Sequence, residues 1–142
     1  MPSTMTEDER NAFLAEPHVA VLAVEQPGRG PLTVPVWYAY SPGGEVAVLT
    51  SSDSVKARQV RAAGRFTIIV QVAEQPYRYV AAEGPAVFND ATYDDVLGMA
   101  LRYLPQAQAL GYAESIQGES NVMIRMTPER WLSKGQSRLE QI

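Results

Sequence analysis

Residues 32–51 of this 142-residue chain constrain its fold most, because they contain two strand-like segments joined by a tight turn. Residues 32–40 are rich in Val, Trp and Tyr, and residues 45–51 contain the apolar run V-A-V-L. The letters between them, S-P-G-G, are turn formers, so the pattern predicts a β-hairpin. Because Pro35 cannot donate a ladder hydrogen bond, we expect its strand to lie at a sheet edge or to contain a bulge.

Four further segments have the composition of strands: residues 19–24, 66–72, 77–88 and 121–132. Gly84 and Pro85 interrupt the third of these, which predicts a bend or bulge there. Six strands separated by short turns favour a mainly β fold. We therefore expect an antiparallel barrel with helical additions, formed by a single domain over residues 1–142.

Two short helices are predicted in the first half of the chain. The letters T-E-D-E at residues 6–9 have the form of a capping box, and the helix that they begin should end before Pro17. A second helix follows the hairpin. We expect Ser52 or Asp53 to cap it and Gly64 to end it.

A longer helix is predicted over residues 93–104, after the potential cap N-D at residues 89–90. Pro105 should end it, and a weaker helix is expected over residues 106–112. Three side chains here, Met99, Tyr103 and Tyr112, are most simply core residues, with a dimer or substrate surface as the alternative.

Composition excludes several classes of site. The chain has no cysteine and a single histidine, His18, so thiolate metal sites, disulfides and Ser-His catalysis are not expected. A net charge of −4 argues against a nucleic-acid binder. No segment reads as a secretory signal or a bilayer span, so we expect a cytoplasmic protein without a membrane partner.

The turn after the hairpin has the chemistry of a phosphate site. Hydroxyls at residues 50–52 precede a helix start where backbone amides are free, and Lys56 follows one turn later with Arg58 and Arg61. The alternative is a plain helix cap followed by a solvated basic face. Neither a P-loop nor a G-x-G-x-x-G pattern is present, which argues against an NTPase or a Rossmann fold.

The order of these segments carries a family resemblance. The succession V-P-V-W-Y-A-Y, V-A-V-L-T-S-S, S-V-K-A-R-Q-V-R and P-Y-R-Y-V-A-A-E-G-P-A resembles the split β-barrel superfamily of pyridoxamine-phosphate oxidases and their deazaflavin-dependent relatives. The resemblance covers roughly residues 6–132. It implies a six-stranded antiparallel split β-barrel and a homodimer with two cofactor sites at the subunit interface.

The resemblance also assigns residues to cofactor binding. It implies that the phosphate and ribityl side of the cofactor is held by Leu49, Thr50, Ser51 and Lys56. It implies that the ring system is backed or contacted by Pro35, Val36, Trp37 and Tyr79. It assigns no catalytic residue and no metal ligand.

Departures from the oxidase pattern favour one branch of this superfamily. Val34 and Ala39 stand where the oxidases have an arginine for the FMN phosphate and a lysine for the substrate phosphate, which argues against pyridoxal-phosphate synthesis. The P-Y-R-Y-V strand and the short chain resemble the branch that uses coenzyme F420. The resemblance therefore implies a reductase that transfers a hydride from reduced F420 to a conjugated small molecule.

Two alternatives remain open. Within the same fold, the chain could be an FMN-binding oxidoreductase or flavin reductase, with other cations in place of the missing arginine. Outside catalysis, it could be a barrel that carries a cofactor or serves as an interaction module.

Overall fold

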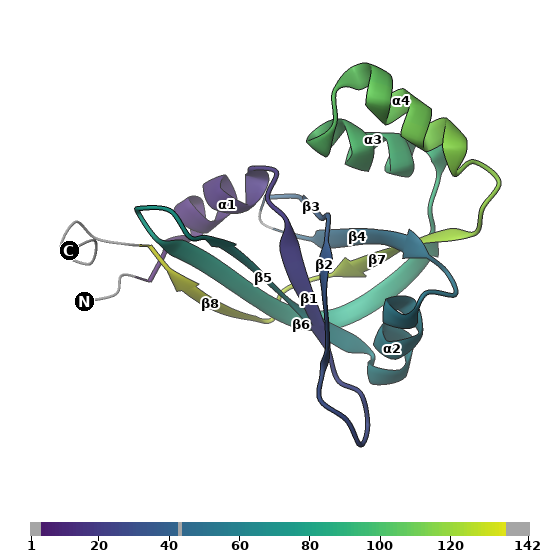
Figure 1. The fold of residues 1–142 in the computed structure, drawn as a ribbon. Coiled ribbons are helices and arrows are strands. Elements are labelled where there is room, and N and C mark those ends of the chain that lie inside the picture. Colours follow the sequence, from purple (N-terminus) through teal and green to yellow (C-terminus); the bar gives the residue numbers. More distant parts are fainter. Residues whose placement is uncertain (1–3, 43, 136–142) are drawn as a thin grey trace.

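The computed structural model describes residues 4–42 and 44–135, which form a curled antiparallel sheet with four helices outside it (Figure 1). The strands are β1 (Ala20–Val24), β2 (Leu32–Val36), β3 (Ala39–Tyr40), β4 (Val46–Ser51), β5 (Arg65–Val72), β6 (Arg78–Asp90), β7 (Asn121–Met126) and β8 (Arg130–Lys134). The helices are α1 (Glu7–Ala15), α2 (Val55–Ala63), α3 (Tyr93–Tyr103) and α4 (Gln106–Ser115).

The connection between β2 and β3 explains why the sheet curls. The strand order is β2-β1-β5-β6-β7-β4-β3, and β8 pairs with β6. β2 and β3 therefore lie at opposite ends of the order, although only Trp37 and Tyr38 separate them along the chain. This short link brings the two ends of the sheet together, as in a split barrel.

The described chain has eight strands where the sequence predicted six, because two predicted strands are each interrupted. The expected strand 32–40 is divided at Trp37 and Tyr38, where the chain stops pairing with β1 and begins to pair with β4. The expected strand 121–132 is divided into β7 and β8. Pro35 lies in β2, at an end of the strand order, as its missing donor requires.

β6 passes through Gly84 and Pro85 without a break, but it changes partners there. Its first part pairs with β5 and β8, and from Ala86 onward it pairs with β7. The link between β7 and β8 crosses directly over this point. A Cβ built on Gly84 would lie 2.2 Å from the carbonyl oxygen of Thr127, so glycine is required by the close approach of two backbones.

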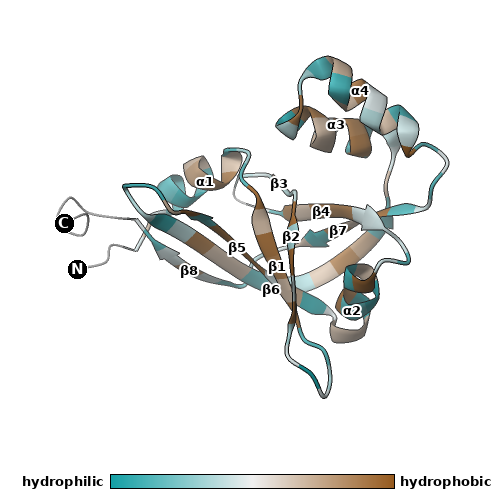
Figure 2. Ribbon diagram, in the orientation of Figure 1, coloured by the Kyte–Doolittle hydropathy of each residue, from teal (hydrophilic) through white to brown (hydrophobic). Residues whose placement is uncertain are grey.

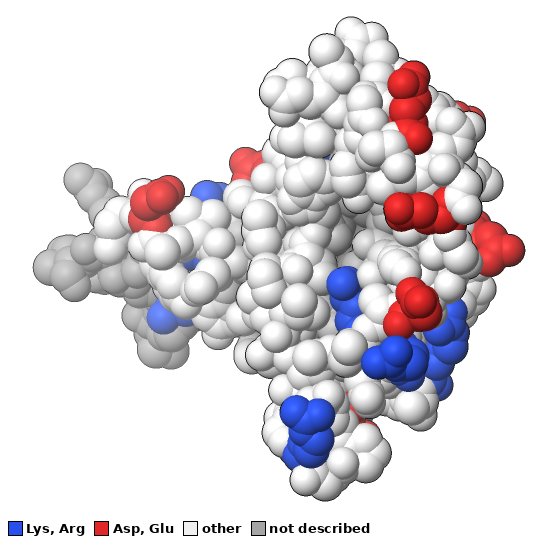
Figure 3. All heavy atoms as spheres, turned by 45° about the vertical axis from the view of Figure 1, so that its right-hand side comes forward, with Lys and Arg blue, Asp and Glu red and all other residues white. Residues whose placement is uncertain are grey.

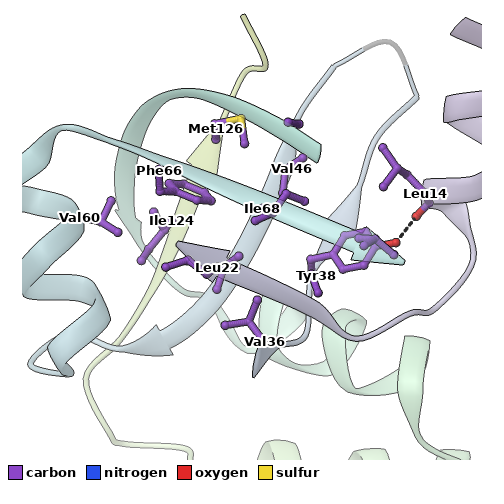
Figure 4. Packing of buried hydrophobic residues seen from close by; sticks show 14 of the residues in the cluster. Leu14, Leu22, Val36, Tyr38, Val46, Val60, Phe66, Ile68, Ile124 and Met126 are labelled. Carbon is purple, nitrogen blue, oxygen red and sulfur yellow. Dashed lines mark hydrogen bonds between the residues drawn. The ribbon is translucent and has the colours of Figure 1, made fainter. Parts of the chain in front are cut away.

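The core fills the interior of the curled sheet. Alternate residues of β1, β5 and β6 face inward, and Leu22, Ile68 and Val80 are almost fully buried. Figure 4 shows Leu22 and Ile68 among the inward side chains of β4 and β7, with Val60 of α2 at one end and Tyr38 at the other. Apolar residues mark the strands in Figure 2, whereas the loop between β1 and β2 is hydrophilic.

The helix ends agree with the sequence predictions at two positions and differ from them at two others. Thr6 and Glu9 form the predicted capping box, and the hydrogen bond that the Thr6 backbone amide donates to the Glu9 carboxylate lowers the pKa of Glu9. Gly64 ends α2 with a φ of 76°, as predicted. The predicted caps of α2 and α3 were wrong, because Ser54 caps α2 and Thr92 caps α3. Among the described residues, no helix has the length and apolar character to cross a membrane.

Candidate functional site

The turn between β4 and α2 is fixed by a chain of hydroxyl hydrogen bonds. Thr50, which is buried, donates through Oγ1 to Ser54 Oγ over 3.0 Å, and Ser54 Oγ accepts the Ala57 amide over 3.2 Å. Ser51 Oγ donates to Asp53 Oδ1 over 2.6 Å. The turn is thus held rigidly, and the amides of Val55 and Lys56 in the first turn of α2 precede the hydrogen-bond ladder of the helix.

Cations gather at this turn, and they are not equivalent. Figure 3 shows blue atoms over the region of α2, with red atoms among them. Arg58 and Arg61 are bonded back onto the turn, to the carbonyl oxygens of Asp53 over 3.0 Å and Ser52 over 2.8 Å. Lys56 has no hydrogen bond or ion pair within the described chain. Of the three cations at this turn, the Lys56 ammonium is the one best placed to bind an external anion.

Asp53 adds an opposing charge beside the same turn. The hydrogen bond from Ser51 lowers the pKa of this exposed carboxyl, so it is ionised at neutral pH. A carboxylate this close repels an anionic ligand, although solvent screens the repulsion. The turn can therefore receive a phosphate through Lys56 and the helix amides, with Asp53 limiting the affinity.

An aromatic surface lies on the outer face of β4. Trp37 and Leu49 both pack against the small cluster of Ala47, Met99 and Met123. The Trp37 indole is stacked on the Tyr103 ring, with centroids 4.7 Å apart and planes 8° from parallel. Tyr112 of α4 lies tilted against the same indole at 6.1 Å. A partly exposed indole held in this way offers a flat surface for a ring system.

The other predicted site residues are spread over two regions. Pro35 is exposed on β2, whereas the side chain of Val36 lies in the core, which leaves only its backbone for a ligand. Tyr79 lies on β6 between Gln71 and Lys134, three strands away from β2 in the sheet order. One chain therefore brings Leu49 together with Trp37 and places Thr50 and Ser51 in the turn before Lys56, and it leaves Tyr79 apart.

Sequence reasoning missed Arg102, which joins α3 to α1. Its guanidinium donates to the carbonyl oxygens of Leu14, Ala15 and Glu16, each over 2.8 Å, and lies over the Tyr38 ring at 4.7 Å. Tyr38 Oη donates to the Leu14 carbonyl as well, over 2.8 Å (Figure 4). Burial raises the pKa of Tyr38, which keeps its hydroxyl protonated. The sequence offers only one signal for this contact, which is a basic residue in the last turn of α3. The carbonyl groups that it binds lie more than 80 residues earlier in the chain, so the sequence pattern does not identify them.

A cavity of 220 Å³ lies between α3 and the outer faces of β3, β4 and β7. Ala39, Ala47 and Met99 form an apolar part of its lining. Arg125 also lines it and bonds to Glu45 over 3.1 Å and to Asp95 over 3.6 Å. The volume of this cavity is too small for a tricyclic cofactor, since ligand pockets usually exceed about 300 Å³.

Comparisons with known proteins identify the fold. No protein-family model and no curated protein matches the sequence. Among solved structures, a conserved hypothetical protein, Rv2991, from Mycobacterium tuberculosis is 22% identical, with a TM-score of 0.79 over 95% of this chain and 88% of that one. An F420 reductase is 20% identical, with a TM-score of 0.67 over 86% of this chain and 94% of that one.

A third structure, a putative pyridoxamine 5′-phosphate oxidase from Listeria innocua, is 18% identical, with a TM-score of 0.66 over 89% of this chain and 96% of that one. In each of the three comparisons the matched region covers most of both chains. The chain therefore has the split β-barrel fold of the pyridoxamine 5′-phosphate oxidase-like proteins.

Proposed function

We propose that this protein is an oxidoreductase that binds coenzyme F420 and reduces a conjugated small-molecule acceptor. The observation that carries the proposal is Lys56, a cation at the first turn of α2 that has no hydrogen-bond or ion-pair partner among the described residues, in a fold shared with an F420 reductase. The cytoplasmic location expected from the sequence is part of this proposal.

The residues present fit a cofactor with a phosphate at one end and a flat ring at the other. Lys56 and the first-turn amides would hold the phosphate, and Ser51 would donate its hydroxyl to it only in place of its bond to Asp53. Leu49 of β4 and Trp37 of the link between β2 and β3 would support the ring. When bound, the cofactor would supply the hydride, so the chain mainly has to hold two flat molecules face to face.

Parallel titration of the protein with F420 and with FMN tests this proposal. Selective binding of F420, followed by turnover with enones or quinones, would support it. Selective binding of FMN would favour a flavin-dependent oxidoreductase, and tight binding without turnover would favour a cofactor carrier. Failure to bind either cofactor would refute the proposal.

Lys56→Ala should weaken binding of the cofactor. Loss of one charge-assisted contact to a phosphate removes about 1.5 to 3 kcal/mol, which is roughly a 10- to 150-fold rise in Kd. The fold should not change, because Lys56 makes no hydrogen bond or ion pair to any described residue. Calorimetric titration of the variant with the better-binding cofactor measures the effect.

Arg65→Ala is the matched control for loss of one positive charge. Arg65 lies on β5 and pairs with Glu129 over 3.2 Å and Glu83 over 3.7 Å, away from the α2 turn. Its removal should leave the Kd unchanged within experimental error. Equal affinity of Lys56→Ala, Arg65→Ala and the unmodified protein would show that phosphate is not held at Lys56.

The proposal includes a homodimer, for which the sheet offers a surface. One row of outward-facing apolar residues crosses five paired strands in exact register: Pro35, Val21, Ile69, Ala81 and Leu132. Val21 and Ile69 are each 38% exposed and Leu132 is 63% exposed. A continuous apolar row of this kind is typical of an interface with a second chain. Tyr79 lies two residues before Ala81 on the same face of β6, so a second copy on this face would lie near it.

Leu132→Lys should convert the dimer into a monomer, because a symmetric interface that covers this row would bury the introduced lysine in each of the two copies. The fold should persist, since the side chain is largely exposed in the single chain. Val87→Lys is the control: Val87 is 64% exposed but lies on β6 outside this row. Sedimentation equilibrium distinguishes the outcomes, and a monomeric unmodified protein would contradict the dimer.

A further inference from the structure

The break between β2 and β3 leaves backbone groups without a sheet partner, and the Tyr103 hydroxyl supplies one. Tyr103 Oη accepts the Tyr38 amide over 3.1 Å and lies 3.0 Å from the carbonyl oxygen of Tyr38. It donates over 2.7 Å to the carbonyl oxygen of His18, just before β1. One phenol thus joins the end of α3 to two segments of the barrel.

The same side chain fixes the neighbouring indole. Trp37 immediately precedes Tyr38 in the break, so regular strand pairing does not set its direction. Its one parallel ring contact among the described residues is with Tyr103. Tyr103 therefore controls both the backbone beside Trp37 and the plane of its ring.

A second anchor makes this arrangement rigid. Arg102, the residue before Tyr103, binds three carbonyl oxygens at the end of α1 and lies 5.7 Å from the Tyr103 ring. Met99, one turn earlier on α3, is buried against the outer face of β4. The last turn of α3 is therefore held on both sides, and the Tyr103 ring has little freedom to move.

We propose that Tyr103 is a positioning residue that holds the Trp37 indole in the orientation needed to bind the cofactor ring. This inference rests on the proposed function, because it places Trp37 beside the ring. Tyr103 itself does not have to touch the cofactor. Its contribution is preorganisation, since a freely rotating indole would have to be ordered when the ring binds.

The test uses a background in which Trp37 is the only tryptophan. Trp131, the other tryptophan, packs against Arg10 on the far side of the barrel, and Trp131→Phe preserves an aromatic ring there. In this background Tyr103→Leu removes both the stacking and the hydroxyl, whereas Tyr103→Phe removes only the hydroxyl. Tyr93→Leu is the matched control on the same helix, because Tyr93 is 38% exposed and has no described ring contact with Trp37.

Two readouts are needed, both at a temperature where far-UV circular dichroism shows every variant to be folded. Near-UV circular dichroism and fluorescence anisotropy report the orientation and mobility of Trp37 without any ligand. Tyr103→Leu should lose most of the indole signal and bind F420, or FMN if that binds better, about threefold to tenfold more weakly. Tyr103→Phe should restore part of both properties, because it keeps the stacking on Trp37 but loses the hydrogen bonds of the hydroxyl, and Tyr93→Leu should match the background.

The outcomes separate this inference from the proposed function. Absence of binding by the unmodified protein would overturn the proposed function, whatever the indole does. If the cofactor binds but Tyr103→Leu leaves the indole signal unchanged, Tyr103 does not hold Trp37. If the indole becomes mobile and the Kd stays the same, its orientation does not matter for binding, and this inference alone is overturned.

Discussion

Gly84→Ala should lower the free energy of unfolding by about 3 kcal/mol or more, the upper end of the range for overpacked sites. The added methyl group would lie 2.2 Å from the Thr127 carbonyl oxygen and 3.3 Å from the Glu129 amide nitrogen. These are backbone atoms of the link between β7 and β8, and Glu129 donates there to the Glu83 carbonyl over 2.8 Å. No side-chain rotation can relieve the overlap, so the link itself has to move.

Chemical denaturation of Gly84→Ala, monitored by circular dichroism, measures this loss. Gly111→Ala is the control, because a Cβ at Gly111 in α4 meets nothing within 4 Å. Alanine favours a helix over glycine, so this control should gain about 0.4 to 1 kcal/mol. If both variants changed stability equally, the close crossing at Gly84 would not limit the fold.

Arg102→Met should lower the free energy of unfolding by about 2 to 3 kcal/mol, because charge-assisted bonds to the end of α1 are lost together with stacking on Tyr38. The loss is smaller than three separate bonds would suggest. Tyr38 still donates to the Leu14 carbonyl, and water can reach the exposed Ala15. Arg102→Lys should recover only part of the stability, since an ammonium cannot match a planar fork of donors.

Arg58→Met is the matched control for this experiment. Arg58 also donates to a backbone carbonyl oxygen, that of Asp53, but it is exposed and makes only one such bond. Its replacement should change stability by less than about 0.5 kcal/mol. Thermal unfolding of the three variants, with limited proteolysis near residues 16–19, would show whether α1 has been released. Equal behaviour of Arg102→Met and Arg58→Met would contradict the anchoring role.

Features set by neighbouring residues could be predicted from the sequence. The capping box of Thr6 and Glu9 acts within one helical turn, and Gly64 ends α2 because only its own backbone has to adopt a positive φ. The cap of α2 was less predictable, since several hydroxyls and a carboxylate compete in that turn. Ser54 caps the helix, and Thr50 and Ser51 bond to other side chains instead.

Features set by distant residues could not be predicted in this way. Trp37 and Tyr38 have the composition of a strand, so nothing in the local sequence marks the break between β2 and β3. The break is stabilised by Tyr103, which lies 65 residues away in the chain. The second break follows Met126, where β6 changes its partner. For the site, the grouping of Leu49 with Trp37 required the barrel to close first. Their roles toward a cofactor, like that of Tyr79, stay predictions.

The pairing of β4 has a consequence for synthesis of the chain on the ribosome. β4 is complete at Ser51, but its long partner β7 begins only at Asn121. At about 5 to 20 residues per second, the intervening stretch takes several seconds to translate. During that interval one edge of β4 is open, and a nascent chain with an open apolar edge is a substrate for chaperones and a site for aggregation.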